Sequence, residues 1–254
     1  MGEQRAVTLD LWLTLITEMP PVPGDRDISR NELRLENAVA ALTDAGHSVT
    51  ADDLDVAFKR VRQDMDHAHW NGVDRTFELW VRQVVEYAAP GVFDKLPDDD
   101  ANAVLGAVDD PFLQYPPIIH SSATEVVREL GERGLKVALI SNTGFTSGTA
   151  YRKWFIDLGW EGLFDVIAFS NEVNMAKPTG AIFTDTLEEL GVPPADALHV
   201  GDSLHSDVAG AHAQGMSTVW ISGYDKSEPA IQPDFTIADL SELPATVKEW
   251  LNRG

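Results

Sequence analysis

Hydrophobic and polar residues follow two different patterns along the chain. Beyond residue 116, short apolar runs alternate with amphipathic stretches, which is typical of a parallel sheet built from strands and crossover helices. Near the start, the run 6–11 is short, apolar, β-branched early and carries an acid close to its end, which favours another buried parallel strand. The pattern therefore predicts an α/β fold. The other predicted strands are 136–141, 165–169, 197–200, 217–221 and 235–237, and the predicted helices are 122–133, 147–158, 182–190, 206–214 and 241–251.

A long insert separates the first strand from the alternating region. The breaker cluster 20–24 precedes it, and from residue 29 to about 110 the apolar residues recur at helical spacing. We interpret these stripes as the packing faces of helices. They comprise Leu33, Leu35, Val39, Ala40 and Leu42, then Leu54, Phe58, Val61 and Met65, and then Phe77, Trp80, Val81, Val84 and Val85.

Charge and composition narrow the function classes. The chain has 19 Lys and Arg residues against 41 Asp and Glu residues, and the net charge of −22 repels nucleic acid and anionic lipid. It has no Cys and hence no disulfide or thiolate metal site. No apolar run has the length of a membrane helix, and the first residues lack a signal-peptide profile. We therefore expect a cytoplasmic monomer or homodimer that binds neither nucleic acid nor membranes.

Polar residues follow the predicted strands at four places. Asp10 lies at the end of the first strand, residues 141–144 follow the second, Lys177 comes after the third and Asp202 after the fourth. Open α/β sheets bind ligands beyond the carboxyl ends of their strands. We therefore expect these four places to converge at one edge of the sheet.

Three acids would share this edge, namely Asp10, Asp202 and Asp207. Carboxylates at close range repel one another or bind protons unless a cation lies between them. Mg²⁺ prefers oxygen ligands and binds through one or two carboxylates, waters and substrate phosphate. Asp10 and Asp202 are the expected ligands, whereas Asp207 is expected to bind a water of the ion or to orient Lys177.

The same residues suit phosphoryl transfer. A carboxylate oxygen of Asp10 can attack an electrophile and form a covalent intermediate. Thr14 and Ser141 can bind the oxygens of the transferred group, and Lys177 can offset its negative charge. The residues by themselves thus predict a phosphoryl-transfer site.

Four segments resemble, in order and spacing, the motifs of the haloacid dehalogenase-like hydrolase superfamily, in its subgroup with a helical, C1-type cap. The resemblance covers residues 1–16 and 116–240, and the four motifs are specific together although each alone is weak. They are Asp10-Leu-Trp-Leu-Thr14-Leu, Ile140-Ser-Asn-Thr-Gly144, Lys177-Pro178 and Gly201-Asp-Ser-Leu-His-Ser-Asp207.

The resemblance implies a Rossmann-like parallel sheet whose first strand is central. It also implies a core domain of residues 1–16 and 116–254, a helical cap domain of residues 17–115, a Mg²⁺ cofactor and a small phosphorylated substrate. The implied catalytic residues are Asp10 as nucleophile, Ser141 and Lys177; the metal ligands are Asp10, the backbone carbonyl of Trp12, Asp202 and Asp207; and the substrate-binding residues are Thr14, Asn142 and Trp12.

Trp12 departs from the family pattern. Phosphatases of the family carry a second Asp there, which protonates the leaving oxygen and then activates water, and general acid–base catalysis contributes about 10²- to 10⁴-fold. An aromatic residue at this position is similar to the 2-haloacid dehalogenases, in which the first Asp displaces halide from carbon without metal. The Gly201-Asp202 pair favours the phosphatase, because dehalogenases have Ser-Asn there. A ligand-binding protein with little or no turnover is the third alternative.

Several histidine and tryptophan residues have structural interpretations. His67 and His69 do not share a helical face and lack a third ligand, so zinc is not expected there. His199 and Trp220 lie on predicted buried strands and are expected in the core. Trp12 itself is as readily a packing residue as one that controls access of substrate.

Three arginines, Arg26, Arg30 and Arg34, lie at or before the first predicted helix of the insert. One of them could hold a carboxylate or phosphate of the substrate. Surface salt bridges are nevertheless the expectation for each of them.

Overall fold

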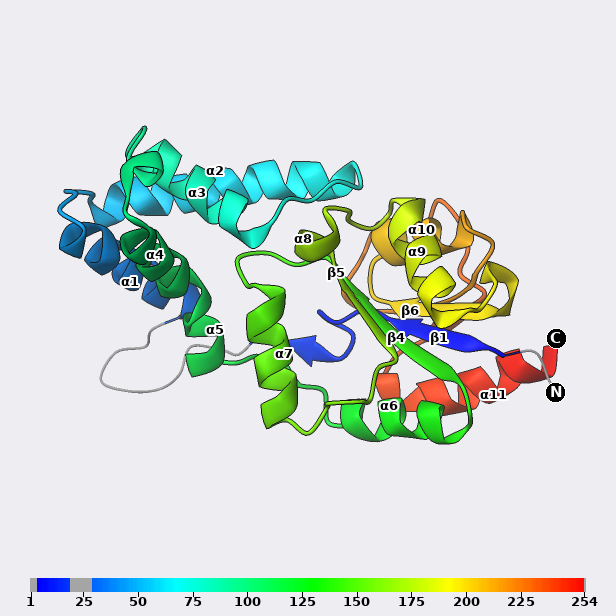
Figure 1. The fold of residues 1–254 in the computed structure, drawn as a ribbon. Coiled ribbons are helices and arrows are strands. Elements are labelled where there is room, and N and C mark those ends of the chain that lie inside the picture. Colours follow the sequence, from blue (N-terminus) through cyan, green and yellow to red (C-terminus); the bar gives the residue numbers. More distant parts are fainter. Residues whose placement is uncertain (1–3, 19–28, 254) are drawn as a thin grey trace.

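The structure of this protein is a computed structural model, and it describes residues 4–18 and 29–253. At its centre is a six-stranded parallel sheet with the order β5-β4-β1-β6-β7-β8 (Figure 1). The predicted α/β fold with a central first strand is therefore confirmed. The strands are β1 (Ala6–Leu9), β4 (Lys136–Ser141), β5 (Val166–Phe169), β6 (Ala197–Gly201), β7 (Ser217–Ile221) and β8 (Phe235–Ile237).

Helices cover both faces of the sheet because each central strand buries alternate residues on opposite sides. Val7 and Leu9 pack in one apolar cluster with α6 (Ala123–Glu132), α7 (Gly148–Asp157) and α11 (Leu243–Arg253). Ala6 and Ala138 face the other way, toward α9 (Gly180–Leu190) and α10 (Gly210–His212). Figure 1 shows α6 and α11 below the sheet and α9 and α10 above it. The strand order reverses at β1, which leaves a crevice at the carboxyl ends of β1 and β6.

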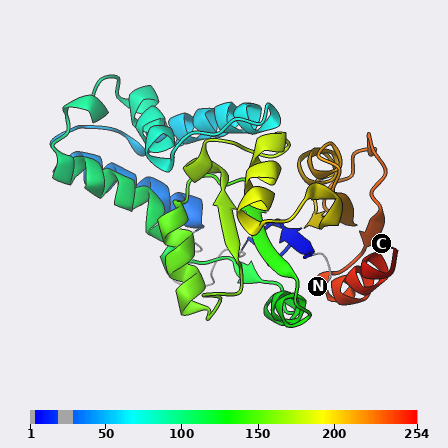
Figure 2. The same ribbon diagram turned by 45° about the vertical axis from the view of Figure 1, so that its right-hand side comes forward.

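The insert forms a separate group of helices, which both views show on one side of the sheet (Figure 1 and Figure 2). Their apolar faces form a cluster of their own, and Phe145 from the loop after β4 belongs to it. The predicted boundaries of the cap domain stay a prediction. The helices are α1 (Arg30–Asp44), α2 (Ala51–Trp70), α3 (Phe77–Ala88), α4 (Asp98–Asp109) and the short α5 (Pro111–Gln114), with the 3₁₀ turn η1 (Phe93–Lys95) between α3 and α4.

Local capping signals explain where the insert helices begin. The Ser29 side chain accepts a hydrogen bond from the Glu32 backbone N–H, and the Glu32 carboxylate accepts one from the Ser29 backbone, which completes a capping box. The apolar stripes of the sequence did not predict α4. The reason is that α4 buries only Val104 and Val108 after an acidic first turn, which is too short a stripe to recognise.

Two short strands join the insert to the sheet. β2 (Ile16–Thr17) and β3 (Ile118–Ile119) pair antiparallel, so the segments leading into and out of the insert lie side by side. The other short elements are α8 (Ser170–Val173), η2 (Pro194–Asp196) and η4 (Leu240–Glu242). None of the described helices has both the length and the apolar character that crossing a lipid bilayer requires.

The segment after β6 differs from the predicted helix 206–214. It is a wide π-helical turn, η3 (Leu204–Ala209), followed by α10. Ser203 explains the difference: its carbonyl accepts from the Val208 backbone N–H at 3.1 Å, and its own N–H donates to the Asp207 carboxylate at 3.0 Å. The turn thereby directs Asp207 back toward the end of β6.

Candidate active site

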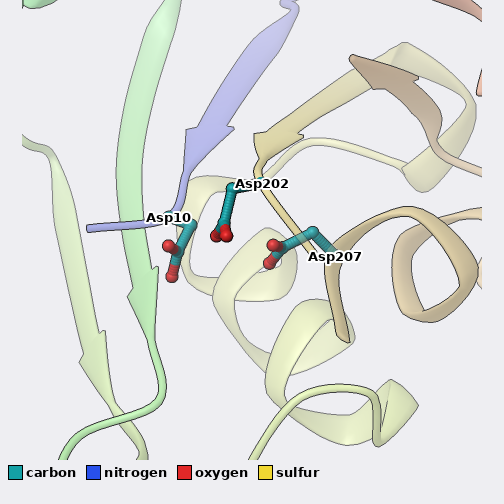
Figure 3. A group of neighbouring side chains, drawn as sticks. All are labelled: Asp10, Asp202 and Asp207. Atoms are coloured by element: carbon teal, nitrogen blue, oxygen red, sulfur yellow. The ribbon is translucent and has the colours of Figure 1, made fainter. Parts of the chain in front are cut away.

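The three acids converge at the carboxyl ends of β1 and β6, as Figure 3 shows. Asp10 follows β1 directly, and its backbone N–H donates to Val200 O at 2.9 Å. Asp202 follows β6, and Asp207 lies on η3. One carboxylate oxygen from each of the three lies within 4.8 Å of the other two. The expected convergence of these acids is therefore present in the structure.

Close packing of the backbone brings Asp207 to this position. A Cβ atom at Gly201 would collide with the Asp207 side chain, so only glycine fits there. The neighbouring Asp202 is held by its backbone carbonyl, which accepts from Trp220 Nε1 at 2.8 Å. Trp220 was expected in the core, but it is half-buried and contributes to the site through this bond.

Lys177 supplies the positive charge between two of the acids. It lies in the loop between α8 and α9 and is 1% exposed. Its Nζ donates to Asp10 Oδ1 at 2.5 Å and to Asp207 Oδ1 at 2.6 Å. The cluster thus has three carboxylates and one ammonium, which gives it an excess of negative charge.

The pKa values of the three acids express this excess. Burial, together with the Asp207 carboxylate, raises the pKa of Asp10 to about 6 although Lys177 opposes the shift. Burial and the charges of Asp10 and Asp207 raise the pKa of Asp202 to about 8. Burial alone would also raise the pKa of Asp207, but Lys177 and His199 hold it far below its usual value.

His199 is a site residue that the sequence analysis placed in the core. It is buried on β6 as expected, but its Nε2 lies 3.1 Å from Asp207 Oδ1 and its Nδ1 lies 2.7 Å from Thr8 Oγ1. Burial lowers the pKa of His199, so the ring is neutral. Because a carboxylate only accepts, Nε2 donates to Asp207 and Nδ1 accepts from Thr8. The pair Thr8–His199 therefore orients Asp207.

Ser141 and Thr14 lie at the ends of the segments that were expected to bind a phosphoryl group. Ser141 is fully buried at the end of β4, and its hydroxyl makes one long contact, 3.4 Å to Asn142 O. Thr14 is 2% exposed, and its buried Oγ1 has no hydrogen-bond partner among the described residues. An unpaired buried hydroxyl is costly unless a ligand completes it. That either hydroxyl binds an oxygen of a substrate stays a prediction.

Asn142 serves the neighbouring loop. Its Nδ2 donates to Lys177 O at 2.9 Å, and its Oδ1 accepts from the Lys177 backbone N–H at 2.8 Å. This pair of bonds joins the loop after β4 to the loop that carries Lys177. Contact of Asn142 with substrate stays a prediction, whereas its positioning of Lys177 is visible in the structure.

Trp12 is half-buried in the turn after β1, and its Nε1 donates to Tyr151 Oη at 2.8 Å. The next residue, Leu13, has a φ of 59°, a left-handed conformation that is uncommon outside glycine. The turn therefore holds the indole ring in place beside the end of β1. Its backbone carbonyl as a metal ligand stays a prediction.

The insert helices contact two loops of the site through the turn between α2 and α3. Trp70 stacks on His205, which lies between Asp202 and Asp207, with ring centroids 3.7 Å apart. Asp74 Oδ2 accepts from Ser170 Oγ at 2.6 Å, and the same hydroxyl accepts from the Thr143 backbone N–H at 2.8 Å. Side chains of the insert therefore border the site. The two histidines near this turn have different partners: His67 contacts Asn71, and His69 Nε2 lies 3.0 Å from Asp74 Oδ2.

The residues present fit a hard divalent cation. Three carboxylates offer oxygen ligands within 4.8 Å of one another. Burial and the charges of Asp10 and Asp207 raise the pKa of Asp202. A divalent cation would relieve that repulsion, and oxygen ligands are those that Mg²⁺ prefers. Asp10, Asp202 and Asp207 are the side chains that would hold it.

Comparison with known proteins agrees with this fold and site. The sequence model of the haloacid dehalogenase-like hydrolases matches residues 5–215. Glyceraldehyde 3-phosphate phosphatase of Methanopyrus kandleri is 30% identical over 84% of this chain and 88% of its own length. The chain therefore belongs to the haloacid dehalogenase-like hydrolase family, and it is a hydrolase.

Two solved structures share the fold. The 2-haloacid dehalogenase from Pseudomonas syringae pv. Tomato DC3000 has a TM-score of 0.65 at 23% identity and covers 97% of this chain and 99% of its own. The HAD phosphatase from Thermococcus onnurineus has a TM-score of 0.61 at 23% identity and covers 96% and 98%, respectively. One is a dehalogenase and the other a phosphatase, so the shared fold does not choose between the two reactions.

Proposed function

We propose that this hydrolase is a Mg²⁺-dependent phosphatase that acts in the cytoplasm on a small phosphorylated metabolite, through a phosphoryl group carried by Asp10. Residues 17–115 would form its C1-type cap. The observation that carries the proposal is the ratio of three clustered carboxylates to one ammonium. A carbon displacement without metal gives no reason to gather these acids, whereas a phosphatase needs them. The phosphatase from Methanopyrus kandleri supports the same reaction class.

The first step is attack of the Asp10 carboxylate on phosphorus. Lys177 holds Oδ1 of Asp10, so the other oxygen is free to form the bond to phosphorus while the bond to the leaving oxygen breaks. Ser141 and Thr14 bind oxygens of the phosphoryl group, and Lys177 offsets its charge. Bound Mg²⁺ would neutralise carboxylates and phosphoryl oxygens and so allow the two anions to approach. Attack of water on phosphorus then releases phosphate and restores Asp10.

The leaving group has no carboxylic acid at position 12 to protonate it. The indole of Trp12 donates to Tyr151 and is not an acid in the range of physiological pH. Substrates with good leaving groups, such as aryl phosphates, are therefore least affected. Alkyl phosphates need a proton from another residue or from the substrate itself.

The test of the proposed function is phosphate release from an aryl phosphate with Mg²⁺ and with a chelator. We expect hydrolysis that depends on Mg²⁺, because the acid cluster alone repels the substrate phosphate. Equal rates with and without the chelator would exclude the proposal. Chloride release from 2-chloropropionate without metal would instead establish the dehalogenase, and binding without turnover across a panel of phosphorylated compounds would establish a binding protein.

Trp12→Asp is expected to raise kcat on an alkyl phosphate about tenfold or more, because it restores a proton donor beside the nucleophile. The rate on an aryl phosphate should change little. Trp12→Asn is the matched control: it removes the indole and its bond to Tyr151 without adding an acid. Equal rates for the two variants, with both shown to be folded by circular dichroism, would mean that another group protonates the leaving oxygen.

A further inference from the structure

A cavity of about 250 Å³ lies between the insert helices and the core. Trp12 and Asn142 line it, and these residues stand next to the motifs that contain Asp10 and Ser141. Three arginines, Arg30, Arg34 and Arg62, line the same cavity. Two carboxylates, Glu18 and Asp66, also line it, so arginines outnumber acids in this cavity although the chain as a whole has a net charge of −22.

Arg34 brings a buried positive charge that makes no direct bond to a carboxylate of the described residues, although Glu18 and Asp109 act on it at longer range. It is 5% exposed, and burial, together with Arg30, lowers its pKa to about 10. No ion pair to it is present among residues 4–18 and 29–253, so the expectation of a surface salt bridge is wrong for Arg34. Its described hydrogen-bond partners are all neutral: Val108 O at 2.9 Å, Asn31 Oδ1 at 3.2 Å, Phe145 O at 2.7 Å and Thr146 Oγ1 at 2.8 Å.

Arg30 brings a free donor. Its side chain is 7% exposed; Nε donates to Tyr115 O at 2.9 Å, and Nη1 lies 3.0 Å from Glu18 Oε2. The buried Nη2 has no hydrogen-bond partner in the described part of the chain. Glu18 is 66% exposed, so this carboxylate stays hydrated and can leave the guanidinium at little cost. The guanidinium also lies 5.9 Å from the centroid of the Trp12 ring and 5.4 Å from that of Phe112, and Trp12 follows Asp10 by two residues.

A buried guanidinium that makes no direct bond to an acid is unfavourable unless an anion pairs with it. The planar guanidinium group matches the geometry of a carboxylate or a phosphate. Arg26 lies outside the described residues. We propose that this cavity binds a second anionic group of the substrate, a carboxylate or a phosphate on the leaving group, through Arg30 and Arg34, with Arg62 at the edge. The proposal rests on the proposed phosphatase function and names its substrate class: phosphate monoesters of small anionic alcohols.

The test uses three probes that share a three-carbon chain: propyl phosphate, 3-(phosphonooxy)propanoate and propane-1,3-diyl bisphosphate. Their dissociation constants are measured by calorimetry with Mg²⁺ and the Asp10→Asn variant, so that no turnover intervenes. We expect one or both probes with a second anionic group to bind about tenfold or more tightly than propyl phosphate, because charge-assisted bonds to a buried guanidinium are strong. Whether the carboxylate or the second phosphate gains most identifies the anion.

Arg30→Gln in the same background should reduce this preference to about twofold or less. Arg30→Lys, which keeps the charge, should retain part of it. Arg82→Gln is the matched control, because Arg82 lies on α3 in an exposed ion pair with Asp94 and the substitution changes the net charge equally. If Arg30→Gln does not fold, the exposed Arg62→Gln replaces it, with an expected loss of about threefold in the preference.

Equal binding of the three probes, or an equal effect of Arg30→Gln and Arg82→Gln, would overturn the anion site. Failure of the proposed function alone would give another result. The two probes with a second anionic group would still bind more tightly than propyl phosphate, but the unsubstituted enzyme would release no phosphate from an aryl phosphate. The binding and turnover measurements therefore separate the two proposals.

Discussion

Asp10→Asn is expected to lower kcat for an aryl phosphate at saturating Mg²⁺ by about 10³-fold or more. The amide oxygen of Asn is a poor nucleophile, and no other described carboxylate takes the place of Asp10 at the end of β1. Thermal stability at pH 7 should be unchanged or higher, because burial raises the pKa of Asp10 to about 6 and so disfavours its charged form. The measurements are phosphate release and a thermal melt of each protein.

The Lys136–Asp165 pair provides a matched control. Asp165 also accepts from a lysine, Lys136 Nζ at 2.7 Å, but at the opposite end of the sheet. Asp165→Asn should therefore leave kcat unchanged. In the unsubstituted enzyme, mass spectrometry of rapidly quenched reactions should find phosphate on the peptide that contains Asp10. More than a tenth of the activity remaining in Asp10→Asn would refute the nucleophilic role.

Lys177→Met is expected to reduce both activity and stability. It replaces a buried ammonium with an apolar side chain of similar length and leaves the carboxylates of Asp10 and Asp207 unpaired. Breaking a buried ion pair by removing one partner costs about 3–5 kcal/mol in the free energy of unfolding. The loss of charge stabilisation should lower kcat by about 10²-fold or more. Denaturant unfolding and phosphate release measure the two effects.

The stability deficit of Lys177→Met should depend on pH. Without the ammonium, the pKa of Asp10 rises further above that of the unfolded chain, and the pKa of Asp207 loses the charge that does most to lower it. Both changes cost stability as pH rises past the unfolded pKa values of these acids. The deficit should therefore be small at pH 4 and grow toward pH 7. Lys136→Met, which removes the 40% exposed lysine of the other pair, should cost less than about 1 kcal/mol at either pH. A deficit independent of pH would show that Lys177 acts through packing alone.

The apolar pattern was sufficient to predict the sheet and its crossover helices, because the central strands are short runs buried along their length and the helices bury one face with a period of about 3.6. Strand β4 has the predicted bounds, and α6, α7 and α9 begin within two residues of theirs. The pattern did not predict η3, since a wide turn depends on the bonds that Ser203 makes and has no apolar period.

The candidate site was predictable in part for a related reason. Asp10, Ser141, Lys177 and Asp202 follow strands, and parallel strands bring their carboxyl ends to one edge. His199 was placed correctly in the core, but its contact with Asp207 depends on the side chain of a residue eight positions later. Likewise, Arg34 in the sequence is one basic residue among 19, and nothing local shows that it is buried without a carboxylate.

The sequence by itself thus identified the family, the succession of strands and helices along the chain and the candidates for the reacting side chains, because these depend on periodicity and on spacing along the chain. Tertiary structure alone decided which charges are neutralised and which are not. Electrostatic interactions depend on distance and burial rather than on sequence separation. That is why the cluster of acids around Asp202, and a buried Arg34 with only neutral hydrogen-bond partners among the described residues, appear only in the folded protein.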